Sequence, residues 1–121
     1  MCQDNTALEH FSLGNLKISA QSFDMERAFS GCTSLKTVDL SGITTTSSYI
    51  LMDFTFNGCS SLELVDLRNA KTLSSRWWSD CFDGVPSTCT VIVKDSTVKN
   101  AIPSSVKNQV IIKTVAEYEA A

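Results

Sequence analysis

Two aspartates occupy equivalent positions in a sequence motif that occurs twice in the chain. Asp39 lies in "AFSGCTSLKTVDLSG" (residues 28–42) and Asp66 in "TFNGCSSLELVDLRN" (residues 55–69). Two carboxyl groups about 5 to 5.5 Å apart serve a retaining glycosidase, and a calcium ion takes several oxygen ligands. Catalytic carboxyls need a pocket and unequal surroundings, whereas equivalent repeat positions are nearly identical and lie on an open surface. We therefore interpret both as solvated parts of the repeat, partly offset by Arg68, with a calcium site as the alternative.

A cysteine thiol with His10 as its base is the second candidate for chemistry. The chain has five cysteines and one histidine, and the cysteines form no CxxC pair, which argues against a disulfide framework and a zinc site. The repeat register turns Cys32, Cys59 and Cys81 inward and His10 outward, so nucleophile and base do not converge. Cys32 and Cys59 would stack in successive repeats, either as an inter-repeat disulfide or, as we favour, as buried free thiols. The sequence thus predicts no enzyme, no cofactor and no metal.

A period of 26 to 27 residues organises residues 1–94. Phe29, Phe56 and Phe82 mark it, and Cys2 stands one period before Phe29. Apolar side chains recur six, nine and eleven residues after each mark, in the sets Leu8, Leu35, Leu62 (then Thr88); Phe11, Val38, Val65, Val91; and Leu13, Leu40, Leu67, Val93. A period of 20 to 29 residues with such spacing indicates a leucine-rich repeat solenoid, in which stacked coils bury one another.

The elements of such a coil follow from local spacing. "FSL", "VDL", "VDL" and "VIV" alternate inward and outward, which predicts about four short strands in a parallel sheet. "FDMERAF", "ILMDFTF" and "RWWSDCF" carry apolar residues at i and i+4, which predicts helical turns on the convex side. Gly31, Gly58 and Gly84 would turn the chain toward each strand. The predicted fold is α/β: a right-handed β/α superhelix.

Residues 95–121 depart from the repeat and are predicted to form a C-terminal α/β cap and tail within a single domain. "DSTVKNAI" predicts a short helix with Asp95 or Ser96 as its N-cap and Pro103 beyond its end. "QVIIKTV" predicts a strand, and "AEYEAA" a frayed tail. A cap of this kind protects the open edge of the last coil.

Outward-facing strand positions would form the concave face, along which solenoids bind ligands. The candidate binding residues are His10, Ser12, Thr37, Asp39, Ser41, Leu64, Asp66, Arg68, Thr90, Ile92 and Lys94. Trp78 takes the core slot of Met25 and Met52. Its neighbour Trp77 is either an exposed interface anchor or packs against the cap.

Composition excludes two classes of partner. A net charge of −3 and a pI near 5.0 argue against nucleic-acid binding. The longest apolar runs, such as "YILM" at residues 49–52, are too short to span a bilayer. Residues 1–25 include Asp4, Glu9 and Asp24 without an apolar block, so this stretch holds no signal peptide.

"MERAFSGCTSLKTVDLSG" and "FNGCSSLELVDL" resemble the repeats of BspA-type leucine-rich repeat proteins, with their phrase M-x-x-x-F-x-x-C-x-S-L-x-x-V/L-D-L. The similarity covers about residues 1–94 and is strongest over residues 25–67. It departs in the first coil, where Cys2 and Asn5 replace Phe and Cys, and in the last, "VPSTCTVIV". The resemblance implies a non-enzymatic adhesion module that binds a protein or glycan, on the cell surface or secreted.

Two further expectations concern the context of the chain. The alternative function is a structural spacer or a fragment of a longer repeat array, or a surface component of a phage or mobile element. The first coil has no cap of its own, so it either continues into further coils or pairs its exposed strand with a partner. The second option predicts a homodimer through the N-terminal edge.

Overall fold

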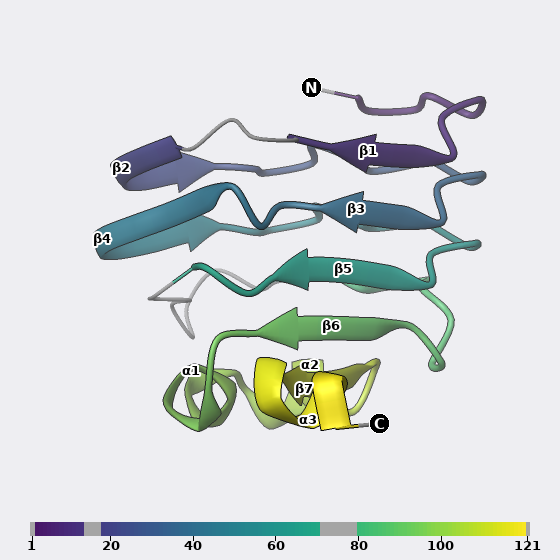
Figure 1. Ribbon diagram of the computed structural model, residues 1–121. Helices are drawn as coiled ribbons and strands as arrows, with labels where there is room; N and C mark the ends of the chain where they lie inside the picture. Colours follow the sequence, from purple (N-terminus) through teal and green to yellow (C-terminus); the bar gives the residue numbers. More distant parts are fainter. Residues whose placement is uncertain (1, 14–17, 71–79, 121) are drawn as a thin grey trace.

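The structure is a computed structural model that describes residues 2–13, 18–70 and 80–120 (Figure 1). In this part of the chain the main sheet has five parallel strands in the order β1-β3-β5-β6-β7. Their bounds are β1 His10–Ser12, β3 Thr37–Asp39, β5 Leu64–Leu67, β6 Thr90–Val93 and β7 Ile111–Thr114. The predicted α/β class with a parallel sheet is confirmed, and the strand of the C-terminal region joins the sheet as β7.

The strands pair in the register of the sequence repeat. Val65 pairs with Val38 on one side and with Val91 on the other, each one period away. The exposed fractions of these side chains are 0% for Val65, 1% for Val38 and 0% for Val91, so this row faces the core. Because side chains alternate along a strand, the neighbouring rows face outward.

A second sheet was not predicted. β2 Ile18–Asp24 and β4 Ile43–Leu51 pair in parallel, with a register shift between Ala20 and Ser22. We call this pair the side sheet; it lies to the left of β1 and β3 in Figure 1. The chain therefore forms a strand in two successive coils where the sequence analysis predicted none.

The predicted helical turns are wrong for the segments around Met25 and Met52, which form turns that pair from coil to coil. Backbone N–H groups donate to the next coil: Met25 to the Leu51 oxygen at 2.9 Å and Phe29 to the Thr55 oxygen at 2.9 Å. In an α-helix these N–H groups would instead donate to carbonyl oxygens four residues earlier in the same segment. The i, i+4 apolar spacing instead reflects side chains that turn inward at both ends of one turn. Most of "RWWSDCF" lies outside the described residues.

Left-handed backbone conformations explain why no helix forms here. Arg27, Phe54 and Asp80, each two residues before a reference Phe, have φ of 59°, 58° and 50°. Gly31, Gly58 and Gly84, each two residues after it, have φ of 78°, 79° and 84°. Left-handed residues do not continue a right-handed helix. Each of these turns therefore carries two such residues, and glycine meets the second without steric cost.

The reference phenylalanines form a column through the core. The ring centroids of Phe29 and Phe56 lie 5.7 Å apart with planes 2° from parallel, and those of Phe56 and Phe82 lie 5.6 Å apart at 9°. Cys2 occupies the same slot in the first coil and is too small to continue the column. Phe11, where later coils have valine, replaces it with an edge contact to Phe29 at 5.0 Å and 65°. In the first coil a small residue stands in the phenylalanine slot and a large one in the valine slot, so the space beside Phe29 stays filled.

The C-terminal region holds three short helices and the strand β7. Asp95 caps α1 (Ser96–Ala101), as predicted, and its carboxylate accepts the Val98 N–H at 3.1 Å. A second short helix, α2 (Ser104–Lys107), follows Pro103. The expected frayed tail is wrong: α3 (Val115–Ala120) forms directly after β7. None of the helices in the described part of the chain is long and apolar enough to cross a membrane.

Candidate binding face

Eight of the eleven predicted binding residues stand in two outward rows of the main sheet, and Ser41, Arg68 and Lys94 lie just after the strand ends. One row across the strands runs His10, Thr37, Leu64 and Thr90, and the next runs Ser12, Asp39, Asp66 and Ile92. His10, Ser12 and Lys94 are exposed, whereas Thr37, Asp39, Ser41, Leu64, Asp66, Arg68 and Thr90 are half-buried. We call the outward side of β1, β3 and β5, with Ser41 and Arg68, the polar face.

Ile92 is the exception, and its assignment to an open surface is wrong. It stands in an outward row, yet its side chain is only 1% exposed. The cause is α3, which packs against β6 and β7. The open part of the face therefore ends before β6.

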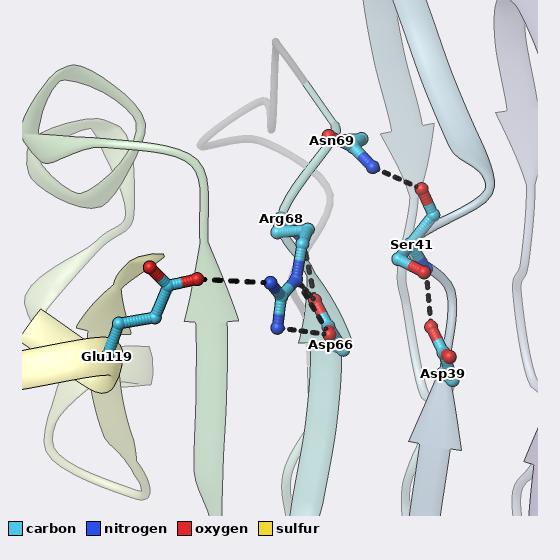
Figure 2. Close-up of polar contacts among 6 residues, drawn as sticks. All are labelled: Asp39, Ser41, Asp66, Arg68, Asn69 and Glu119. Atoms are coloured by element: carbon cyan, nitrogen blue, oxygen red, sulfur yellow. Dashed lines mark hydrogen bonds and ion pairs between the residues drawn. The ribbon is translucent and has the colours of Figure 1, made fainter. Parts of the chain in front are cut away.

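The two aspartates have different surroundings, so the premise that repeat positions give them nearly identical environments is also wrong. The single Nε–H of Arg68 is shared between the two Asp66 carboxylate oxygens at 3.0 and 2.9 Å, and Arg68 Nη2 lies 2.9 Å from Asp66 Oδ2 (Figure 2). Asp39 accepts the Ser41 N–H at 2.9 Å, as Asp66 accepts the Arg68 N–H at 3.1 Å, so the difference lies in the guanidinium contacts. Hydrogen bonds from the Ser41 hydroxyl and N–H, with smaller help from the Arg68 charge, lower the pKa of Asp39. The lowered pKa favours the ionised form of Asp39, so this carboxylate is not poised to donate a proton.

Arg68 is the hub of this region. Its Nη1 lies 3.6 Å from a Glu119 carboxylate oxygen on α3, while its Nε and Nη2 hold Asp66 (Figure 2). Hydrogen bonding to Asp66 is the main reason why the pKa of Arg68 is raised. The next residue, Asn69, donates its side-chain N–H to the Ser41 backbone oxygen at 2.6 Å and so ties the ends of β5 and β3 together. These contacts fix the C-terminal ends of the strands.

The start of the polar face is held by side-chain pairs between β1 and β3. His10 Nδ1 and Thr37 Oγ1 lie 2.7 Å apart in hydrogen-bonding contact. Glu9 and Lys36, one residue earlier in each coil, form an exposed ion pair at 3.8 Å. Pairs of this kind orient side chains across neighbouring strands, so the polar groups of the face do not move independently.

The thiols lie behind the sheet and away from His10. Cys32 donates its S–H to the Cys2 backbone oxygen at 2.9 Å, and Cys59 donates to the Phe29 oxygen at 3.1 Å, so the same bond repeats in two coils. All five cysteines are free, and Cys32 and Cys59 are buried, as the favoured interpretation of these two residues predicts. Burial raises the pKa of Cys59 and Cys89 to about 12. A thiol with such a pKa is a poor nucleophile at neutral pH.

Metal binding finds no support in residues 2–13, 18–70 and 80–120, where the structure shows no group of three or more His, Cys, Asp or Glu side chains placed to hold an ion. The Asp66 carboxylate is already bound by Arg68, so one of the two carboxyl groups of the alternative calcium site is taken. Trp77, the proposed interface anchor, and Trp78 lie outside the described residues.

Sequence reasoning missed three residues that shape the face: Glu117, Glu119 and Asn69. A signal for the first was present, because Thr114-x-x-Glu117 has the pattern of a capping box. Thr114 donates its N–H to Glu117 at 2.9 Å, and Glu117 donates its N–H to the Thr114 hydroxyl at 3.1 Å. No local pattern points to the reach of Glu119 toward Arg68 or of Asn69 toward Ser41. Comparison with family models, curated proteins and solved structures gives no match to this chain.

Proposed function

We propose that this chain is a non-enzymatic recognition module with a leucine-rich repeat solenoid of the BspA type, which binds a protein or glycan through the polar face. A bacterial surface or secreted protein is the context that the sequence resemblance supports. The solenoid is supported by the coil-to-coil pairing, since backbone ladders link residues one period apart at the turns and at the strands. Stacked coils of this kind present one continuous face.

The observation that carries the proposal is the combination of fixed and accessible polar groups on that face. Thr37 is oriented by His10, Asp39 by Ser41, and Arg68 by Asp66, while each side chain keeps part of its surface exposed. Groups that are already ordered lose less conformational entropy when a partner binds. Groups at paired positions on neighbouring strands lie about 4.8 Å apart, which is the spacing of neighbouring extended chains.

The state of the ionisable groups favours binding over catalysis. Both aspartates are hydrogen-bonded and the pKa of Asp39 is lowered, while the thiols with raised pKa values are buried on the other side of the sheet from His10. A catalytic base must come within hydrogen-bonding reach of its nucleophile. On the polar face His10 contacts the Thr37 hydroxyl rather than a thiol.

The test is a binding screen of the chain against immobilised extracellular-matrix proteins, mucins and glycans, with two variants of the polar face. Asp39→Asn removes a charge without changing shape, and Thr37→Lys adds bulk to the centre of the face. Loss of a charged hydrogen bond weakens binding by about tenfold or more. Asp83→Asn is the matched control, because Asp83 is an exposed aspartate in a turn away from the strands.

We expect saturable binding that both polar-face variants weaken and that Asp83→Asn leaves unchanged, at equal melting temperatures. Equal weakening by the control would place the binding site elsewhere. No binding across the panel by a folded chain would contradict recognition and favour the structural spacer. A homodimer through β1, the outermost strand of the main sheet on the N-terminal side, is a separate proposal. It requires a dimer mass in light scattering, and a monomer at high concentration contradicts it.

A further inference from the structure

The C-terminal helix α3 occupies the end of the surface that the first coils leave open. It packs against β6 and β7, and Figure 2 shows Glu119 reaching from α3 across β6 to Arg68 at the end of β5. Ile92, on β6 in the row of Asp39 and Asp66, is buried as a result. A segment of the chain itself therefore covers surface that the repeat register assigns to the outward face.

Polar contacts near the surface hold α3 in place. Its six residues include no buried side chain. Lys99 Nζ lies 3.0 Å from the Glu117 carboxylate, the Thr114 capping box fixes the first turn, and Glu119 lies 3.6 Å from Arg68. A helix this short is not stable alone, and exposed ion pairs contribute little. Local opening of α3 thus requires far less free energy than unfolding the sheet.

We propose that α3 is a displaceable strap that stands in for a ligand, and that a protein segment carrying a carboxylate beside an apolar side chain competes with it for Arg68 and Ile92. The chemistry of the occupant defines the chemistry of the competitor. Arg68 has one guanidinium edge committed to Asp66 and presents the other to Glu119. Ile92, which pairs with Asp66 on the neighbouring strand, supplies a buried apolar side chain. Opening α3 would extend the polar face by one strand.

This inference rests on the proposed function, because it adds β6 to the same face and names an acidic protein segment as the partner. It also explains why the outward row changes character along the sheet. Ser12, Asp39 and Asp66 are polar, whereas Ile92 in the same row is apolar. Ile92 is almost fully buried, and α3 is its cover in the closed state.

Amide hydrogen exchange on the full chain tests whether the strap opens by itself. We expect the amides of α3 to exchange at least ~100-fold faster than those of β5 and β6. Glu119→Arg places like charges together and should accelerate exchange in α3 further, with β5 and β6 unchanged. Glu119→Gln, which keeps shape and polarity, should have a smaller effect. Exchange of α3 at the same rate as β6 would overturn the proposal, because α3 would then open only with the whole fold.

A peptide with the sequence of residues 114–120, TVAEYEA, tests the partner chemistry. Added at millimolar concentration to the Glu119→Arg chain, it should shift the resonances of Ile92 and Arg68 saturably toward their wild-type positions. The same peptide with glutamine for both glutamates should not. Absence of a shift with the acidic peptide would overturn the competition. Failure of the exchange or the peptide experiment would not change the Asp39→Asn result. Conversely, a partner whose binding does not depend on Asp39 would not contradict the displacement of α3. The two proposals can therefore fail separately.

Discussion

The column of turn glycines gives a prediction whose size follows from the structure. Gly58 and Gly84 occupy the same slot with φ of 79° and 84°. Alanine in this left-handed conformation costs about 1–2 kcal/mol, of which about 0.4–1 kcal/mol is recovered because the unfolded chain becomes less flexible. The conformational part of Gly58→Ala and Gly84→Ala is therefore the same, about 1 kcal/mol. Any difference between them must come from space.

The space differs by a few tenths of an ångström. A Cβ on Gly58 would lie 3.7 Å from the Gly31 Cα, an ordinary contact, whereas a Cβ on Gly84 would lie 3.3 Å from the Gly58 Cα. The Gly58 backbone cannot easily retreat, because its N–H donates to the Asp83 oxygen at 2.8 Å. Overpacking of this kind costs about 1–3 kcal/mol. We expect Gly58→Ala to destabilise by about 1 kcal/mol and Gly84→Ala by about 2–4 kcal/mol.

Urea unfolding followed by tryptophan fluorescence, with m-values compared, measures both free energies of unfolding. Asp4→Gly is the control, because it introduces glycine at this slot where the other two variants remove it. Asp4 takes the glycine slot of the first coil at φ of 60°, so glycine there relieves strain and should change stability by no more than about 0.5 kcal/mol. A Gly84→Ala chain as stable as Gly58→Ala would refute the reasoning that the coils approach most closely at this slot.

Three further predictions concern the core, the thiols and α3. Phe56→Ala removes a fully buried ring between two others and should lower the free energy of unfolding by about 3–5 kcal/mol. Phe11→Ala, at the partly exposed end of the column, should lower it less. Equal losses of free energy in urea unfolding would contradict the stacking. Burial raises the pKa of Cys59 and Cys89 from 9.0 to about 12, so the stability that they contribute is complete below pH 9 and is lost as pH rises toward 12. Thermal unfolding that is flat from pH 9 to 11 in the wild type, or as steep in a chain without these two thiols, would contradict this. The Thr114 N–H and then Lys99 lower the pKa of Glu117. The stability that Glu117 gives to α3 is therefore complete above the pKa of an unfolded glutamate, about 4.3, and is lost as pH falls through the lowered value. Loss of the α3 amide signals already between pH 5 and 6 would be inconsistent with this origin.

The strand register could be predicted from the sequence because it depends on a strict period. Val38, Val65 and Val91 stand at equal distances from the reference phenylalanines, and side-chain alternation then assigns inward and outward rows without knowledge of the rest. The Asp95 cap was predictable for a similar reason, since one side chain bonding to an N–H three residues on is a local event.

The turns and the side sheet could not be predicted in this way. Apolar residues at i and i+4 around Met25 are compatible with a helical turn, and only the pairing of Met25 with Leu51 in the next coil decides against it. The burial of Ile92 likewise depends on where α3 lies, which no residue near Ile92 encodes. Asp39 and Asp66 differ because of Arg68, whose counterpart in the previous coil is Ser41. Such differences arise between coils and are invisible to a pattern that treats coils as equal.

Mapping the bound state tests the central claim most directly. With any partner found in the screen, amide chemical-shift changes in the labelled chain should concentrate at His10, Thr37 and Leu64 and extend to β6 only when α3 is displaced. Shifts concentrated at Arg27 and Phe54, whose cation–π contact at 4.7 Å marks the turn side of the coils, would place recognition on the opposite surface and contradict the account.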